Sequence, residues 1–419
     1  MDKFIIEGGH RLQGSLTVSG SKNSALPILA ATLLTRERCV IHRVPNLSDT
    51  RHMLELLRYL GAEVYYEQGT VIVRAETIHA QAPYDLVRKM RASICILGPL
   101  LARCGYAQVS LPGGCVIGDR PIDIHLHGLR ALGATITTES GNIHASATRL
   151  VGQEIFMGGK FGSTVLGTDN VMMAATRADG TTIIENAACE PEVVDLAQVL
   201  CKMGASIQGA GTRRIEIQGA RELHGFEHTI IPDRIEAGTF MVAAAITRSA
   251  IQIRGVCRSH MQAILSQLEA CGVRFSAEGQ TLSLSVPEKL NALEIATDTY
   301  PGFPTDMQAQ FCALLSITSG ISVVTDKIFP NRFMHISELK RMGAQADLQG
   351  NTVIIKGVPY LSGAPVMASD LRASAALVLA GLAAKGNTEV LRVYHIDRGY
   401  ERIDEKLRAV GAVIKRVPQ

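Results

Sequence analysis

The chain has 419 residues, more than a single hydrophobic core usually serves, and this length predicts two domains. Hydrophobic residues make up 47% and charged residues 19% of the sequence, a composition that excludes a disordered chain. The net charge of +3, together with 5% aromatic residues and no tryptophan, argues against a nucleic-acid-binding surface.

The nine cysteines form no C-x-x-C pair and are odd in number, so neither a zinc site nor a disulfide framework is indicated. The N-terminus lacks the apolar segment of a signal peptide, and apolar runs such as 373–384 are shorter than a membrane span. We therefore expect a cytoplasmic protein with reduced thiols and no membrane association.

A Leu-x-x-x-Gly pattern ends an amphipathic stretch at six places, 68 to 72 residues apart. The glycines are Gly61, Gly133, Gly204, Gly272, Gly343 and Gly411. Because glycine lacks a Cβ, it accepts the left-handed conformation that ends a helix, and a β-like run follows each one. The pattern predicts six copies of one unit.

Each copy also holds a second helix that is apolar nearly all round and should be buried. These helices are expected at residues 24–34, 86–103, 170–177, 236–247, 306–318 and 371–384, and further strands at 70–74, 142–147, 214–218, 281–286 and 352–356. The unit therefore reads β-α-β-α-β-β. Apolar helices enclosed by sheets predict an inside-out α/β fold with three repeats in each of two domains.

The sixth copy lacks its last strand, and residues 4–8 resemble residues 353–357, so the N-terminal strand is expected to complete it. One domain would then be discontinuous, comprising residues 1–20 and 230–419 with Asp306 and Arg398. The other would comprise residues 21–229 and carry Cys115.

The loop at residues 111–121 contains three glycines, two bracketing prolines and Cys115, with Arg120 five residues further on. One interpretation is a reactive thiol on a lid, since a nearby cation favours the thiolate. The alternative is an ordinary turn that carries a small buried hydrophobe.

Polar and charged clusters occur where helices are expected to begin, and helix N-termini bind anions. Helix capping is the alternative explanation for Ser21, Thr305, Asp306 and Asp370. Capping does not explain the cations Lys22, Arg91 and Arg372, which oppose the helix dipole unless an anionic ligand offsets the repulsion. His125 and His335 are weaker acid–base candidates, and the charged stretch 394–404 could equally be a solvated turn. The residues suggest a two-domain enzyme that closes on an anionic substrate, with Cys115 on a lid and Asp306 opposite as a base.

Eight motifs, in order along the whole chain, resemble those of the UDP-N-acetylglucosamine enolpyruvyl transferases of the EPSP synthase family. They are Lys22-Asn23, 90–93, 111–115, 120–123, 303–310, 331–335, 370–373 and 395–402. The resemblance implies two inside-out α/β domains and transfer of the enolpyruvyl group from phosphoenolpyruvate to the 3-hydroxyl of UDP-N-acetylglucosamine. The resemblance further implies that phosphate would be released by addition and elimination, in the first committed step of peptidoglycan synthesis, without a cofactor or metal.

The resemblance also assigns roles to single residues. Cys115 would donate a proton to the methylene carbon of phosphoenolpyruvate and react with fosfomycin-type inhibitors, and Asp306 would accept the proton of the sugar hydroxyl. Lys22, Arg120 and Arg398 would hold phosphoenolpyruvate, with help from Arg372. The residues implied for the nucleotide-sugar site are Asn23, Arg91, Arg120, Pro121, Ile122, Asp123, Ile124, Lys160, Ser163, Ile328 and Arg332. The run at 161–170 is longer than the family's diphosphate-binding run, which puts Lys160 and Ser163 in doubt.

Two other functions fit parts of the sequence. Enolpyruvyl transfer to shikimate 3-phosphate uses the same architecture, but the segments at Cys115 and 120–123 disfavour it. An RNA-end-processing enzyme or a non-catalytic scaffold could be built on similar repeats. The low charge and scarce aromatics argue against RNA, and the charged helix starts argue against a scaffold.

Overall fold

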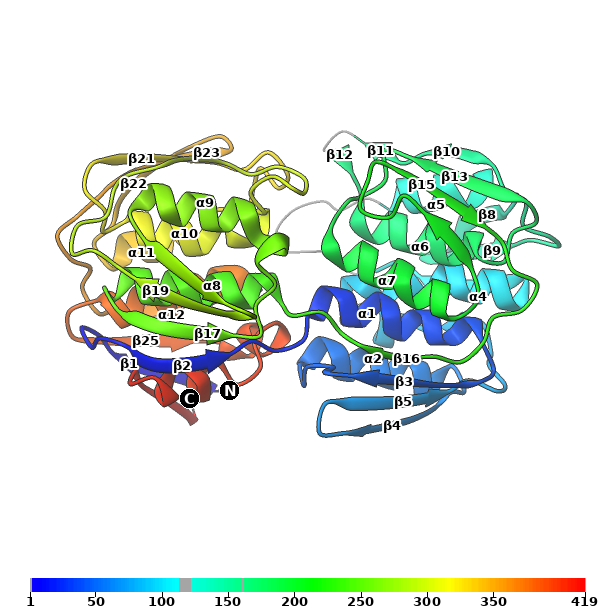
Figure 1. The fold of residues 1–419 in the computed structure, drawn as a ribbon, viewed down its shortest axis with the longest axis horizontal. Helices are drawn as coiled ribbons and strands as arrows, with labels where there is room; N and C mark the ends of the chain where they lie inside the picture. Colours follow the sequence, from blue (N-terminus) through cyan, green and yellow to red (C-terminus); the bar gives the residue numbers. More distant parts are fainter. Residues whose placement is uncertain (1, 113–121, 160–161, 419) are drawn as a thin grey trace. The chain divides into compact units, whose positions relative to one another are not determined.

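The structure is a computed structural model that describes residues 2–112, 122–159 and 162–418. The chain divides into two compact units, and it passes from one to the other between residues 19 and 20 and again between 231 and 232. We call the unit with residues 2–19 and 232–418 the terminal unit. The unit with the remaining described residues is the central unit (Figure 1).

Among the described residues, each unit contains three four-stranded sheets of one design. The strands of each sheet are named below in their order across the sheet. In every sheet the first two strands of this order are parallel to each other, and each later pair of neighbours is antiparallel. The central sheets are β16 (Glu227–Thr229), β3 (Arg38–His42), β5 (Thr70–Arg74), β4 (Glu63–Glu67); β6 (Gln81–Ala82), β7 (Tyr106–Ser110), β9 (Asn142–Ser146), β8 (Thr135–Glu139); and β10 (Glu154–Phe156), β13 (Thr181–Glu185), β15 (Arg214–Gln218), β14 (Ser206–Gln208). The terminal sheets are β2 (Gln13–Thr17), β17 (Ala250–Arg254), β19 (Thr281–Ser285), β18 (Arg274–Glu278); β20 (Glu294–Ala296), β21 (Ile321–Thr325), β23 (Thr352–Lys356), β22 (Gln345–Gln349); and β24 (Pro365–Met367), β25 (Asn387–Leu391), β1 (Asp2–Glu7), β26 (Val413–Pro418).

The first strand of the chain completes the sixth sheet, as predicted. β1 pairs antiparallel with β25 on one side and with β26 on the other. Its residues Phe4 and Ile6 are fully buried, while their neighbours along the strand are not. The alternating pattern of the strand therefore fixes which of its faces packs on the core.

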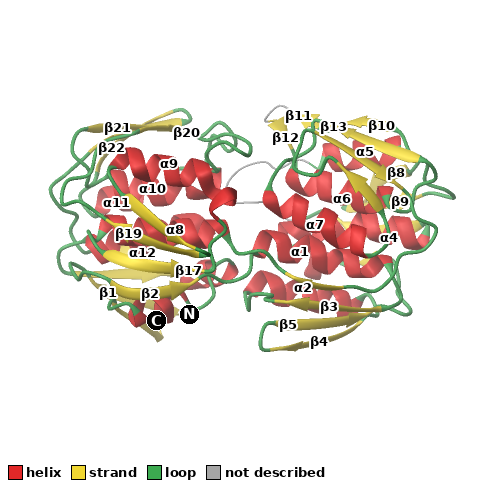
Figure 2. Cartoon of the chain, viewed as in Figure 1, coloured by secondary structure: helices red, strands yellow, loops and turns green. Residues whose placement is uncertain are grey.

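Each unit encloses its apolar helices, so the predicted inside-out α/β fold class is confirmed (Figure 2). The inner helices are α1 (Lys22–Ala31), α4 (Leu97–Cys104) and α6 (Val165–Ala175) in the central unit, and α8 (Arg234–Ile246), α10 (Gln308–Leu315) and α12 (Leu371–Ala383) in the terminal unit. The second helices of the repeats are α2 (Ser48–Tyr59), α5 (Asp123–Ala131), α7 (Pro191–Lys202), α9 (Gln262–Cys271), α11 (His335–Arg341) and α13 (Ile403–Ala409). Short elements are α3 (Tyr84–Val87), the hairpin β11 (Gly158–Gly159) and β12 (Gly162–Ser163), and the 3₁₀ turns η1 (Thr32–Leu34), η2 (Arg91–Ile96), η3 (Arg258–Met261), η4 (Thr305–Met307) and η5 (Val393–Arg398).

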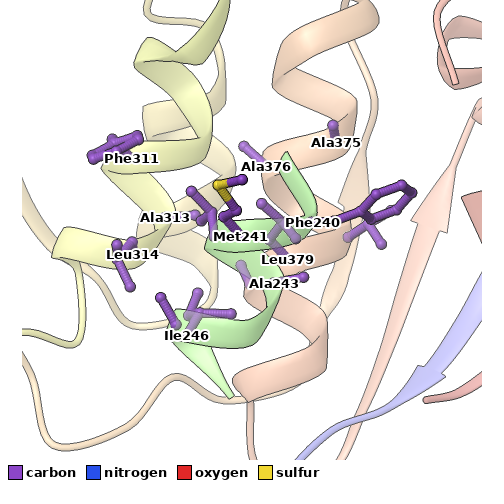
Figure 3. Packing of buried hydrophobic residues seen from close by; sticks show 14 of the residues in the cluster. Phe240, Met241, Ala243, Ile246, Phe311, Ala313, Leu314, Ala375, Ala376 and Leu379 are labelled. Atoms are coloured by element: carbon purple, nitrogen blue, oxygen red, sulfur yellow. The ribbon is translucent and has the colours of Figure 1, made fainter. Parts of the chain in front are cut away.

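The inner helices pack through small and apolar side chains. In the terminal unit, Phe240 and Met241 of α8, Phe311 of α10 and Leu379 of α12 meet in one buried cluster (Figure 3). Alanines between them, such as Ala376, bring the helix backbones close together. Burying each large side chain contributes about 1.5–3 kcal/mol to folding.

All six repeat glycines have positive φ, between 92° and 111°, so the predicted left-handed helix ends are confirmed. The predicted single helix at 86–103 is wrong, because α3, η2 and α4 replace it. Met90 is extended, at φ −150° and ψ 132°. Pro99 lacks the N–H that a continuous helix would use, and it is tolerated because it lies in the first turn of α4. None of the helices in the described ranges is both long and apolar enough to cross a bilayer.

Candidate active site

The carboxylate of Asp306 in η4 is held by two arginines of the terminal unit. Arg332 Nη1 donates to Oδ1 at 2.8 Å, and Arg372 Nη2 donates to Oδ2 at 3.0 Å. The arginine side chains are 7% and 2% exposed, whereas that of Asp306 is 27% exposed. Charge-assisted bonds to both oxygens fix the orientation of the carboxylate. The carboxylate is therefore fixed in orientation and still partly exposed.

Arg372 is buried at the start of α12, where Asp370 caps the helix by accepting from the backbone N–H groups of Arg372 and Ala373. Burial disfavours the charge of Arg372, but the nearby Asp306 and Tyr400 outweigh it, and the pKa of Arg372 is raised above its ordinary value. Its guanidinium carbon lies 5.3 Å from the centre of the Tyr400 ring. A permanently charged group is thus built into the core beside Asp306.

A second carboxylate, that of the fully buried Asp326, supports this arrangement. It accepts from the hydroxyl of Thr305 at 2.7 Å and from the backbone N–H groups of Ile328 and Phe329 at 3.0 and 2.8 Å. Thr305 in turn accepts from Arg332 Nη1 at 3.2 Å. Asp326 therefore joins the turn that carries Asp306 to the turn that carries Ile328.

Lys22 is the first residue of α1 in the central unit, and its side chain is 10% exposed. Its Nζ lies 3.1 Å from Oδ2 of Asp49, in the first turn of α2. A carboxylate of the chain itself therefore offsets the repulsion between Lys22 and the helix dipole. Asn23 follows it on the same turn and is half-buried.

The hairpin of β11 and β12 brings Ser163 and Ile124 into one neighbourhood of the central unit. Ser163 pairs with Gly158, and Gly159 lies so close to Ile124 that a Cβ there would be 2.5 Å from Ile124 Cδ1. Asp123 is exposed at the first position of α5, and Ile122 precedes it as the N-cap residue. The structure thus places Ile122, Asp123 and Ile124 at one helix start.

The two remaining described candidates lie at the ends of 3₁₀ turns. Arg91 begins η2, and its charge acts on the buried Cys95, whose pKa is raised well above its ordinary value mainly by burial. Arg398 ends η5 in the terminal unit and is half-buried. Burial lowers the pKa of His395, and the charge of Arg398 lowers it further. Asp397 of the charged stretch pairs with Arg416 of β26, so this stretch is not a turn with internal ion pairs alone.

Cys115, Arg120, Pro121 and Lys160 lie outside the described residues. The two histidine candidates are buried. His125 contacts the Asn170 side chain at 3.2 Å, and burial lowers the pKa of His335 from 6.5 to about 4. A histidine with such a pKa is neutral at physiological pH and is a poor acid for catalysis there.

For four residues at helix starts, helix capping was the alternative to binding an anionic ligand, and capping explains only one of them. Asp370 caps α12, whereas Ser21 is the N-cap residue of α1 and its side chain makes no capping bond. Thr305 and Asp306 follow the N-cap residue Pro304 and use their side chains to bind Asp326 and the arginines.

The sequence analysis missed Asp49 and Asp326. Asp49 looks like an ordinary acidic residue in a first helical turn, and Asp326 follows a strand in a segment that gives no local signal of burial.

The sequence and structure are similar to those of known proteins. A family model described as EPSP synthase (3-phosphoshikimate 1-carboxyvinyltransferase) matches residues 6–407. The chain is 64% identical to UDP-N-acetylglucosamine 1-carboxyvinyltransferase of Methylacidiphilum infernorum, covering 100% of this chain and 99% of the relative, and 57% identical to the enzyme of that name from Akkermansia muciniphila, with the same coverage. The enolpyruvyl transferase NikO from Streptomyces tendae superimposes with a TM-score of 0.91 at 26% identity, covering 100% of this chain and 99% of that one. An EPSP synthase from Acinetobacter baumannii, 17% identical with full coverage of both chains and a TM-score of 0.77, shares the fold.

Proposed function

The chain belongs to the EPSP synthase family, and we propose that it transfers the enolpyruvyl group of phosphoenolpyruvate to the 3-hydroxyl of UDP-N-acetylglucosamine, the first committed step of peptidoglycan synthesis. The observation that carries this proposal is 64% identity over the full length to a relative named for this reaction. The oriented carboxylate of Asp306 agrees with it, because the reaction needs a base for a sugar hydroxyl.

The reaction has two steps. In the addition, the sugar oxygen bonds to C2 of phosphoenolpyruvate, Asp306 takes the hydroxyl proton and Cys115 gives a proton to C3. In the elimination, the C2–O bond to phosphate breaks and a proton leaves C3, which restores the double bond. The addition therefore needs one group that accepts a proton and another that donates one.

Cations bind phosphoenolpyruvate and stabilise the charge of the tetrahedral intermediate. We assign this role to Lys22, Arg120 and Arg398, with help from Arg372. The buried positions of Lys22 and Arg372 support this assignment, because electrostatic interactions are stronger where water is excluded.

The nucleotide sugar is assigned to a larger set of residues. The set is Asn23, Arg91, Arg120, Pro121, Ile122, Asp123, Ile124, Lys160, Ser163, Ile328 and Arg332. Support comes from the closeness of Ile124 to the β11–β12 hairpin and from the anchoring of the Ile328 turn by Asp326. A cytoplasmic location belongs to the same proposal, and the eight free cysteines among the described residues suit a reducing compartment.

A phosphate-release assay tests the function directly. Purified protein is incubated with phosphoenolpyruvate and either UDP-N-acetylglucosamine or shikimate 3-phosphate as acceptor. We expect phosphate release only with the nucleotide sugar. Turnover with shikimate 3-phosphate alone would assign the chain to the other activity of its family.

A further inference from the structure

We propose that Asp195 is a positioning residue that fixes the start of helix α1, and with it Lys22, to the segment by which the chain leaves the central unit. The inference rests on the proposed role of Lys22 in binding phosphoenolpyruvate. Asp195 lies on α7, its side chain is fully buried, and the reaction described above makes no use of it.

Three donors, from helix α1, from strand β16 and from the segment after this strand, converge on this carboxylate. The hydroxyl of Ser24 on α1 and the backbone N–H of Ile231 donate to Oδ2, the latter at 3.3 Å, and His228 Nε2 of β16 lies 2.8 Å from Oδ1. The backbone N–H of Ser21 also donates to the carbonyl of Ile231 at 2.7 Å. Asp195 therefore connects α1 to the last residue before the chain passes into the terminal unit.

The neighbours of His228 fix the tautomer of its ring. Lys202 Nζ lies 3.0 Å from His228 Nδ1 and 2.9 Å from the carbonyl of Glu227. An ammonium group can only donate, so Nδ1 accepts and the ring proton of a neutral imidazole is on Nε2. His228 then donates to Asp195, whose two oxygens accept from all three groups. Three hydrogen bonds offset the cost of burying the carboxylate.

Helix α1 needs such an anchor because its own sequence does not provide one. Its N-cap residue Ser21 makes no capping bond, and its first turn contains no acidic residue to offset the dipole and Lys22. Ser24 is the third residue of the helix, so its bond to Asp195 holds the same turn that carries Lys22. Displacement of a substrate-binding cation by as little as about 1 Å can strongly lower activity.

Matched variants separate positioning from folding. His228→Gln retains one amide donor for Asp195 and one oxygen for Lys202, whereas His228→Met removes both. Ser24→Ala removes one bond, and Ser316→Ala is the control, since it is a fully buried serine on the end of α10 in the terminal unit.

Two measurements test the inference. Hydrogen–deuterium exchange of the first turn of α1 should rise about fivefold in Ser24→Ala and His228→Met, the effect of losing one hydrogen bond of ordinary strength, and stay at the wild-type rate in His228→Gln and Ser316→Ala. The KM for phosphoenolpyruvate should rise by a similar factor in the same two variants. A loss of folded protein alone would lower the apparent kcat without moving KM.

The outcomes distinguish failure of the inference from failure of the proposed function. Absence of phosphate release from the wild-type protein would contradict the proposed function, and the exchange measurement would still test the anchor. Unchanged exchange of the α1 turn in both Ser24→Ala and His228→Met would overturn the inference. Increased exchange with an unchanged KM would overturn the link between the anchor and Lys22.

Discussion

Replacing Asp306 by asparagine tests the proposed base with almost no change in shape. The neutral amide cannot accept the hydroxyl proton, and the loss of a general base lowers kcat by about 10²- to 10⁴-fold. This corresponds to about 3–5 kcal/mol of activation free energy. The effect should appear mainly in kcat, because the other protein groups that bind the two substrates are unchanged.

The same substitution has a cost in stability that follows from the two arginines. Asparagine keeps one oxygen for Arg332 or Arg372 but turns an NH₂ group toward the other, so one charged hydrogen bond is lost in a mostly buried setting. Such a loss amounts to about 1.5–3 kcal/mol. In a domain of this size each kcal/mol lowers Tm by about 2–4 °C.

The assay is phosphate release at saturating substrates, combined with a thermal melt. Asp347→Asn is the matched control, because Asp347 is exposed on β22 and should leave both the rate and the Tm unchanged. If Asp306→Asn retains more than about a tenth of the wild-type kcat, then Asp306 is not the base. A large fall in KM with the fall in kcat would point instead to relief of strain in the bound substrate.

Three further predictions follow from particular residues. Cys115→Ser should strongly impair turnover near neutral pH and abolish labelling by fosfomycin, measured by intact-protein mass spectrometry, whereas Cys115→Asp should retain activity because a carboxylic acid also donates a proton. His335 has a depressed pKa of about 4 when folded and 6.5 when unfolded, so the unfolded state binds more protons between these values. Stability should therefore be complete above pH 6.5 and fall by about 3 kcal/mol as the pH drops to 4, and His335→Gln should flatten this dependence in urea titrations. Gly159→Ala places a Cβ against Ile124, so the KM for UDP-N-acetylglucosamine should rise about tenfold while Tm changes little, since only the end of a flexible side chain must move.

Each of these predictions has its own control and its own contradicting result. Cys104→Ser removes an exposed thiol and should keep both labelling and rate, and continued labelling of Cys115→Ser would refute the assignment of the reactive cysteine. His10→Gln changes an exposed histidine and should leave the acid dependence of stability as it is. For Gly159→Ala, an equal rise in both KM values would indicate a general disturbance of the unit.

The periodicity of the sequence predicted the fold well because the repeat is enforced by local physics. In each of the six repeats one helix is followed by a glycine with positive φ, a conformation that glycine adopts more readily than any other residue. The continuous helix predicted at 86–103 failed for a reason that is also local. Met90 is extended and interrupts the helical stretch, and Pro99, which lacks a backbone N–H, lies in the first turn of a new helix, where that N–H is not needed.

The site was harder to predict because its polar contacts join distant parts of the chain. Asp306 meets Arg372, 66 residues further on, and the partner of Lys22 is 27 residues away on another helix. Charges at helix starts indicated an anionic ligand, but nothing in their spacing showed that Asp49 pairs with Lys22. Residue types therefore predicted the chemistry, and only the fold revealed which groups act together.

The helix starts show where the repeat has been adapted for chemistry. α6, α8 and α12 each begin with a side chain that caps the helix: Thr164, Asp233 and Asp370. Helices α1, α4 and α10 begin without a side-chain cap, and of these three only α1 has a lysine at its first position. A missing cap alone costs about 1 kcal/mol. A cation at an uncapped helix start opposes the helix dipole, and such a departure from a local rule is expected at a functional position. The buried carboxylates Asp49 and Asp195 stabilise this unfavourable start from two neighbouring helices, so the cost of placing Lys22 there is distributed over the central unit.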